Sequence, residues 1–154
     1  LLNYDEIFGT VLNRFIVQAV VGYPLTVYGK GGQTRGYINI RDTMRCIELA
    51  LQNPAAAGQF NIYNQITETF SVNELAEKVA RIGRERGHKV EVQNMENPRV
   101  EKEEHYYNPT YSALNNLGLA PNLLTDDVLH SMFVKVEQHK CSIQQHKIVR
   151  GVKW

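Results

Sequence analysis

Apolar residues recur at a helical spacing near the start of the chain. Between Phe8 and Val21 they stand three or four positions apart, so this segment is predicted to be an α-helix. Gly22 is the expected C-cap, and Pro24 prevents the helix from resuming. Later helices are predicted at residues 43–52, from 71 to 83 or 87, at 111–117 and at 125–139.

Polar residues mark where three of these helices begin. Asp42 is the expected N-cap of the helix at 43–52. Ser71 and Glu74 form the S-x-x-E pattern of a capping box. Thr125 precedes two acidic residues, which suit the positive end of a helix dipole. Each of these helices therefore has an expected start as well as an apolar pattern.

Short β-rich segments lie between the predicted helices. Strands are expected at residues 25–28, 36–40, 59–63 and 89–93. Strands that alternate with helices are typical of α/β and α+β domains. We expect one such domain over residues 1–139, followed by a polar carboxy-terminal tail at 140–154.

The glycine-rich stretch GKGGQTRG, from Gly29 to Gly36, lies between two predicted strands. A dinucleotide-binding turn needs its glycines between a strand and a helix, and a phosphate-binding P-loop needs G-x-x-x-x-G-K-[ST]. Neither pattern is present, and no tyrosine is followed four positions later by the lysine of a Y-x-x-x-K catalytic pair. We therefore expect neither bound NAD nor a catalytic residue in this chain alone.

Composition narrows the classes of partner. The chain has 17 basic and 16 acidic residues and a net charge of +1, whereas a dedicated nucleic-acid binder usually has a basic excess. No apolar run approaches the roughly 20 residues of a membrane span. The first residues lack the basic start of a signal peptide. Cys46, expected in the core, and Cys141, expected in the tail, suit a cytoplasmic protein. The histidines show no metal-ligand spacing, so no metal is expected.

Several motifs resemble a known family. LTVYGKGGQTRGYINIRD, at residues 25–42, is similar to a segment of the extended short-chain dehydrogenase/reductase (NAD-dependent epimerase/dehydratase) family. DEIFGTVLNRF, FSVNELAEKV and NPRVEKEEHYYN narrow the resemblance to the UDP-sulfoquinovose synthase branch, over about residues 3–138. The resemblance implies a Rossmann-related α/β fold. This chain would be its carboxy-terminal, nucleotide-sugar-binding portion, without the amino-terminal half that holds NAD⁺ and the catalytic Thr, Tyr and Lys.

The resemblance also implies which charged residues bind a UDP-sugar. Arg35 and Arg99 match arginines that reach the diphosphate, which a guanidinium can bind bidentately. Glu101 is the candidate for the ribose hydroxyls, because a carboxylate accepts two hydrogen bonds. The alternatives are a solvated surface arginine at position 35 and an ordinary charged turn at 99–104. Gly36 stands where the wider family has an aspartate after this arginine.

Uncharged contacts are implied in three further segments. The strand formed by Thr26, Val27 and Tyr28 matches the one that meets the uracil through backbone groups and an aromatic neighbour, although sheet packing is an alternative role for the tyrosine. Asn13 and Arg14, in the middle of the first predicted helix, match residues that face the nucleotide. Gln33 and Thr34 are candidate polar contacts near the sugar or the phosphates.

Three functions remain open at this point. The chain is the UDP-sugar-binding portion of an enzyme and is inactive alone, or it is a stand-alone structural or interaction module, or it works with a separate polypeptide that supplies the amino-terminal half. Either isolated form would expose apolar surface that another part of the fold normally covers, so we expect a homo-oligomer.

Overall fold

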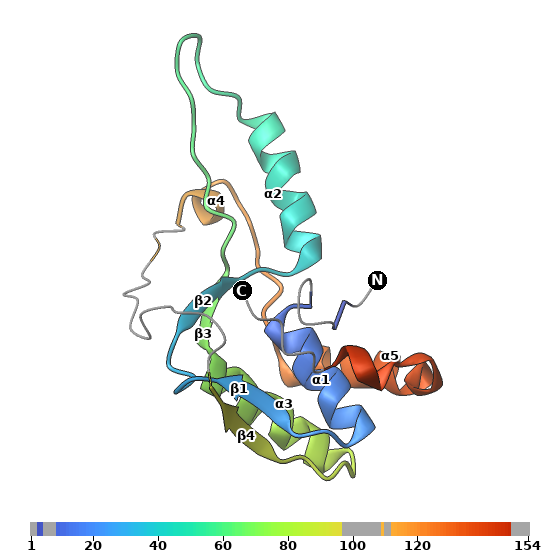
Figure 1. Ribbon diagram of the computed structural model, residues 1–154. Helices are drawn as coiled ribbons and strands as arrows, with labels where there is room; N and C mark the ends of the chain where they lie inside the picture. Colours follow the sequence, from blue (N-terminus) through green and yellow to red (C-terminus); the bar gives the residue numbers. More distant parts are fainter. Residues whose placement is uncertain (1–2, 5–8, 97–108, 110–111, 149–154) are drawn as a thin grey trace. The chain divides into compact units, whose positions relative to one another are not determined.

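The computed structural model describes residues 3–4, 9–96, 109 and 112–148. These residues belong to two compact units, each assembled from separate stretches of the chain (Figure 1). Unit 1 comprises Leu1–Gln33, Ser71–His105 and Thr125–Trp154. Unit 2 comprises Thr34–Phe70 and Tyr106–Leu124. No helix of the described residues has both the length and the apolar character that crossing a bilayer requires.

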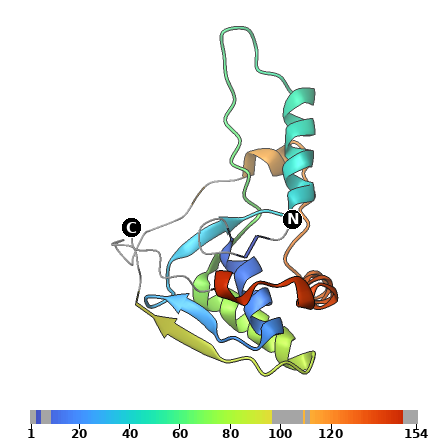
Figure 2. The same ribbon diagram turned by 45° about the vertical axis from the view of Figure 1, so that its right-hand side comes forward.

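Unit 1 is built around a buried helix. In its described residues it contains α1 (Val11–Val21), β1 (Leu25–Tyr28), α3 (Val72–Glu85), β4 (Val92–Met95), α5 (Asp126–Gln138) and the short 3₁₀ turns η1 (Lys140–Ser142) and η2 (Gln145–Lys147). Helix α1 packs against both α3 and α5, as Figures 1 and 2 show. Arg14 and the six residues after it are all buried, so α1 is enclosed on more sides than the predicted stripe required.

Three of the predicted helix ends of unit 1 are confirmed, although α1 begins at Val11 rather than at Phe8. Gly22 closes α1 with a φ of 77°, a left-handed conformation that glycine adopts without strain. Ser71 and Glu74 make both bonds of the capping box, and these bonds to the Glu74 carboxylate lower its pKa. Thr125 caps α5 by accepting from the Val128 N–H. Local hydrogen bonding therefore sets these boundaries.

The two strands of unit 1 form a parallel pair. Leu25 pairs with Val92, and the register continues to Tyr28 and Met95. The strand predicted at 89–93 is displaced to Val92–Met95. The Arg84 guanidinium donates to the Val90 carbonyl at 3.0 Å, before this strand begins.

Unit 2 is smaller and has a smaller core. In its described residues it contains β2 (Thr34–Tyr37), α2 (Ile40–Gln52), β3 (Glu68–Ser71, of which Ser71 already belongs to unit 1) and α4 (Ser112–Asn116), and β2 pairs with β3. The core cluster is formed by Cys46, Leu49, Leu114 and Leu119. The core position predicted for the first of these is confirmed.

The predicted start of α2 is wrong. Asn39 caps the helix by accepting from the Arg41 N–H at 3.0 Å, so the strand expected at 36–40 ends earlier. Asp42 lies inside the first turn and is 1 % exposed. Its carboxylate accepts from the N–H and the side-chain amide of Asn122, at 2.8 and 2.5 Å. Asp42 therefore bonds a residue distant in the sequence and does not cap the helix, as the sequence had suggested.

The predicted strand at 59–63 is also wrong. These residues have no regular secondary structure, and Phe60 and Ile62 are 81 % and 73 % exposed. A strand needs a neighbour to bond its backbone, and the described residues supply none for this segment. The strand β3, which the sequence did not predict, forms where β2 provides that neighbour.

The chain beyond α5 is not devoid of structure. After η1 and η2, Ile148 is buried at 2 % exposure. The division at residue 139 into domain and tail stays a prediction.

Candidate functional site

The edge of β1 that faces away from β4 is bonded by side chains of α1. The N–H groups of Leu25 and Gly29 both donate to the β4 side, so the backbone groups of Thr26 point to the opposite edge. Gln18, which is fully buried, accepts from the Thr26 N–H at 3.1 Å and donates to its hydroxyl at 2.8 Å. Arg14 donates from Nη2 to the Thr26 carbonyl at 3.1 Å.

The same arginine holds the aromatic ring at the end of β1. The Arg14 guanidinium carbon lies 4.8 Å from the centroid of the Tyr28 ring and 5.7 Å from that of Phe15. Arg14 is only 7 % exposed, so this cation–π contact is largely shielded from water. The Gln33 side chain donates to the Tyr28 carbonyl at 3.2 Å. Ring and backbone at this position are therefore both fixed.

Three backbone carbonyl groups of the glycine-rich loop after β1 accept hydrogen bonds from asparagines of β4 and α3. The Gly29 carbonyl accepts from Asn94 Nδ2 at 2.9 Å. Asn73, in the first turn of α3, donates from Nδ2 to the Lys30 carbonyl at 2.9 Å and from its N–H to the Gly31 carbonyl at 3.0 Å. Within the described residues, the N–H groups of Gly31 and Gly32 donate no hydrogen bond. Two asparagines thus set the course of this loop.

One glycine of the loop cannot carry a side chain. Gly31 has a φ of 74°, and a Cβ there would lie 2.1 Å from Asn73 Oδ1 and 2.6 Å from a methyl carbon of Val27. At Gly32 a Cβ would meet nothing within 4 Å. Only the first of these glycines is required by packing.

Four of the residues predicted to bind substrate come together in unit 1. They are Arg14, Thr26, Tyr28 and Gln33, and they surround the outer edge and carboxyl end of β1. In open α/β sheets, ligands bind at the carboxyl ends of strands. The Thr26 backbone, however, already bonds Gln18 and Arg14 within the chain.

The other predicted residues fall into three groups. Val27 is fully buried as a core side chain, and Asn13 is half-buried on α1. Thr34 and Arg35 belong to β2 of unit 2, where the exposed Arg35 Nη1 donates to the Thr34 carbonyl at 3.0 Å. Arg99 and Glu101 lie outside the described residues.

Arg35 also acts on a neighbouring phenol in unit 2. Burial raises the pKa of Tyr37 to about 12, because a phenolate is poorly solvated there, and the positive charge of Arg35 partly opposes the rise. The Tyr37 ring packs against Phe70 with centroids 5.7 Å apart.

Sequence reasoning missed three residues that organise the cluster. Gln18 stands four positions after Arg14, so both fall on one side of α1. A lone glutamine within the apolar run IVQAV was the available signal. Asn73 and Asn94 gave no such signal, since asparagine is common in helix first turns and at strand ends, and their contacts join residues distant in the sequence.

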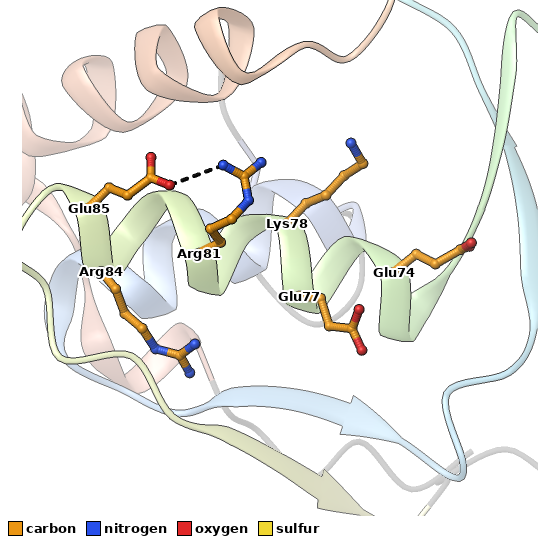
Figure 3. Close-up of a pocket in the computed structure, with 6 residues that line it drawn as sticks. All are labelled: Glu74, Glu77, Lys78, Arg81, Arg84 and Glu85. Carbon is orange, nitrogen blue, oxygen red and sulfur yellow. Dashed lines mark hydrogen bonds and ion pairs between the residues drawn. The ribbon is translucent and has the colours of Figure 1, made fainter.

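A concavity in unit 1 lies on the exposed face of α3. It has a volume of about 740 Å³ and is lined by Glu74, Glu77, Lys78, Arg81, Arg84 and Glu85 (Figure 3). Three acidic and three basic side chains balance one another, and ion pairs join Arg81 to Glu85 at 3.1 Å and to Asp126 at 2.6 Å. None of the predicted site residues lines it. This face therefore has no preference for an anionic ligand.

A smaller concavity of about 310 Å³ lies where the chain enters β1, beside Pro24, His88, Lys89 and Lys140. That is the amino end of the strand, opposite the end where Tyr28 lies. It does not involve the predicted site residues.

The glycine-rich loop does not fit a dinucleotide. The glycine-rich loop joins β1 to β2, so no helix follows it to meet a pyrophosphate. The Asn73 side chain also occupies the space beside Gly31 that a closely approaching ligand would need. Among the described residues, no group of three His, Cys, Asp or Glu side chains is arranged to hold a metal ion.

Comparison with known proteins relates the chain to one enzyme family. The model of the NAD dependent epimerase/dehydratase family matches residues 3–64. The chain is 53 % identical over 152 residues to the chloroplastic UDP-sulfoquinovose synthase of Spinacia oleracea, covering 99 % of this chain and 32 % of that protein. It is 43 % identical over 154 residues to the UDP-sulfoquinovose synthase of Sulfolobus acidocaldarius, covering 99 % of this chain and 39 % of that protein. The chain thus spans between about a third and two fifths of these relatives.

A solved structure shares the fold. UDP-glucuronic acid 4-epimerase from Bacillus cereus, in complex with UDP-glucuronic acid and NAD, matches with a TM-score of 0.62, covering 84 % of this chain and 40 % of that one. The sequence identity is 20 %, so the likeness bears on the fold alone. The α/β arrangement of this chain matches part of that epimerase.

Proposed function

We propose that this chain is the carboxy-terminal, UDP-sugar-binding portion of an NAD-dependent epimerase/dehydratase family enzyme, because it matches that family's model over residues 3–64 and corresponds to about a third of the UDP-sulfoquinovose synthases it resembles. The observation that carries the proposal is the 53 % identity over 152 residues. NAD belongs to the family as a whole, and the glycine-rich loop of this chain does not fit it.

In unit 1 the proposed role is recognition of the nucleotide base. Tyr28 is half-buried at the carboxyl end of β1, and its ring supplies a flat apolar surface for uracil. Arg14 acts through that ring, because its guanidinium holds the ring in place while its Nη2 bonds the Thr26 carbonyl. The Thr26 N–H is bonded to Gln18, so we assign the base contact to the tyrosine rather than to this amide.

In unit 2 the proposed role is recognition of the diphosphate. Arg35 is exposed on β2, and a guanidinium binds phosphate oxygens through two parallel hydrogen bonds. Thr34 beside it and Gln33 before it remain proposed polar contacts. Arg99 and Glu101 remain proposed contacts to the diphosphate and ribose.

Titration calorimetry with UDP, UDP-glucose and uridine tests the proposal. Arg35→Ala is expected to weaken UDP at least about tenfold, the value of one charge-assisted hydrogen bond or more, and to leave uridine unchanged. Tyr28→Ala is expected to weaken both ligands. Arg45→Ala is the matched control, because it removes an exposed arginine of the same unit that pairs with Glu48. Absence of UDP binding at millimolar concentration contradicts the proposal.

Catalysis is tested separately. The purified chain is expected not to convert UDP-glucose and sulfite when NAD⁺ is added, since it lacks the Y-x-x-x-K pair and the dinucleotide turn. Product formation under these conditions would show that the chain holds a reaction centre that its motifs do not reveal.

Self-association is a second candidate function, favoured by a different observation. Unit 2 leaves large apolar side chains exposed, with Ile40, Leu51, Phe60 and Ile62 each more than 70 % accessible. Exposed apolar groups of this size favour association. Light scattering at increasing concentration is expected to show a homo-oligomer, and a monomer throughout would contradict this candidate.

A further inference from the structure

The concavity at the amino end of β1 is formed by three segments of unit 1. The end of α1 together with Pro24 forms one side, the connection from α3 to β4 forms another, and the start of η1 forms the third. Its volume of about 310 Å³ is at the lower end of the range for small-molecule sites. Among the described residues, none of those proposed to bind the UDP-sugar lines it. The space is separate from the carboxyl end of β1, where Tyr28 lies.

Two backbone carbonyl groups at the end of α1 have no donor within the described residues. A continuing helix would bond the Val20 carbonyl to the N–H of residue 24 and the Val21 carbonyl to that of residue 25. Pro24 has no N–H, and the Leu25 N–H donates instead to the Glu91 carbonyl at 2.8 Å. No other donor in the described part of the chain reaches either carbonyl. Because both valines line the concavity, their carbonyls are available there as hydrogen-bond acceptors.

Two lysines supply positive charge to the same concavity. Lys140 makes no ion pair or side-chain hydrogen bond with any described residue. Lys89 pairs with Glu91 at 3.6 Å, but the two side chains are 90 % and 66 % exposed, so water screens this pair. The Nε2 atom of His88 lies 2.8 Å from Glu137, which holds the imidazole ring in place as part of the wall. The two lysines are therefore the mobile donors of the concavity.

The combination of donors and acceptors selects a class of ligand. Two lysines and one glutamate give the lining a net positive charge, apart from His88, and this charge favours an anionic ligand. The unpaired carbonyls and the Glu91 carboxylate accept hydrogen bonds, so they favour hydroxyl or amino groups. A phosphate ester of a small polyol has hydroxyl groups and about two negative charges. A zwitterionic amino acid has similar groups but no net charge, so the excess of lysine favours the ester.

We propose that this concavity binds a small phosphorylated polyol. The phosphate group contacts Lys89 and Lys140, and the hydroxyl groups donate to the carbonyls of Val20 and Val21. The site lies at the end of β1 opposite to the proposed uracil contact, so it is independent of the proposed UDP-sugar function. Lysines near the end of a helix also complement its dipole without any ligand, and the experiments below distinguish these two roles.

A titration of the purified chain, followed by amide NMR signals, tests the class of ligand. Glycerol 3-phosphate is expected to bind with a dissociation constant of about 1 mM and to shift the signals of residues 19–22 and 87–91. Inorganic phosphate is expected to bind about fivefold more weakly, because it lacks the polyol hydroxyls that reach the valine carbonyls. Glycerol and glycine are expected not to bind. Shifts confined to other residues, or binding of phosphate or glycine as tight as that of the ester, overturn the proposal.

Charge variants test the residues assigned to the phosphate. Lys140→Gln and Lys89→Gln are each expected to weaken glycerol 3-phosphate about fivefold, because each removes one positive charge from a partly solvated site. Lys135→Gln is the matched control, since it removes an exposed lysine in the last turn of α5 that does not line the concavity. Glu91→Gln is expected to strengthen binding about threefold, because it removes a negative charge near the phosphate. A gain in affinity cannot come from a damaged fold.

The outcomes distinguish a ligand site from lysines that only complement helix ends. Unchanged affinity in both lysine variants overturns the site, and so does an equal loss in Lys135→Gln. Arg35→Ala, which is expected to weaken UDP, is expected to leave glycerol 3-phosphate unaffected. Absence of UDP binding therefore contradicts the proposed function alone, and absence of glycerol 3-phosphate binding at about 10 mM, tenfold above the expected dissociation constant, overturns this site alone.

Discussion

Units 1 and 2 differ in how much of their apolar surface is buried and in how many of their buried polar groups are hydrogen-bonded. In unit 1, α1 is enclosed by α3, α5 and β1, and the outer edge of β1 is bonded by Gln18 and Arg14. In unit 2, the core is small, and α2 and the segment at 59–63 present large apolar side chains to solvent. Unit 1 therefore buries most of its large apolar side chains, whereas unit 2 leaves several of its own exposed.

The largest expected effect is in unit 1. Gln18→Ala leaves the fully buried Thr26 hydroxyl and N–H without their partners and opens a cavity, so we expect a loss of about 3 kcal/mol in the free energy of unfolding. Urea denaturation followed by circular dichroism measures it. Gln65→Ala, at an exposed site of unit 2, is the control and is expected to change stability by less than about 0.5 kcal/mol. An equal loss of stability in the two variants would contradict the view that the buried hydrogen bonds of unit 1 contribute more to stability than the exposed residues of unit 2.

A somewhat smaller effect distinguishes two glycines of one loop. Gly31→Ala forces a side chain into a left-handed conformation and against Asn73, and is expected to cost about 2 kcal/mol. Gly32→Ala meets open space and is expected to cost less than about 0.5 kcal/mol. Thermal unfolding of both variants provides the comparison. A similar loss in both would show that loop entropy, rather than contact with α3, controls this region.

Sequence patterns predicted best where a segment's partners lie close in the chain. The caps at Gly22, Ser71 and Thr125 were predicted because each bond joins neighbours. The predicted strand at 59–63 failed because alternation shows that a segment can pair, not that a neighbour is present. Asp42 was misassigned because its carboxylate bonds Asn122, 80 positions away.

Of the candidate site, the sequence predicted the residues that resemble the family but not the residues that hold them in place. Family resemblance identified Arg14, Thr26, Tyr28 and Gln33, which the fold does bring together. Gln18, which bonds Thr26, and Asn73, which holds the loop between Tyr28 and Gln33, were missed. Their importance comes from burial and from a loop contact, which no local pattern shows.

A third prediction concerns the pH dependence of unit 1. Hydrogen bonds from Arg86, and then from His88, lower the pKa of Glu137 to about 2. A depressed carboxylate pKa stabilises the fold above its unfolded value of about 4.5, and that contribution disappears as the pH falls from about 4.5 to about 2. We expect a loss of about 2 kcal/mol, since the side chain is 29 % exposed and partly screened.

Urea denaturation between pH 5 and pH 2.5 measures this loss, and Glu137→Gln is expected to reduce the pH dependence in that range. An unchanged slope in the variant would place the acid sensitivity elsewhere. This ion pair joins the C-cap of α3 to α5, so the measurement tests unit 1 alone.

The smallest expected effect is a titration in unit 2. Tyr37, with its pKa raised to about 12 by burial, is expected to remain largely protonated at pH 11, where an exposed phenol with a pKa near 10 is ionised. Arg35→Ala removes the positive charge that favours the phenolate, so the pKa rises further. Absorbance at about 295 nm follows the change, with Tyr37→Phe identifying the component and Arg45→Ala as the charge control. Raising the pH from 10 towards 12 also removes the stability that the protonated phenol contributes, so the fold must be monitored alongside. A Tyr37 pKa near 10 would contradict this prediction. It would show that water reaches the face of β2 that packs against Phe70, so that unit 2 is even less well buried than its exposed apolar side chains indicate.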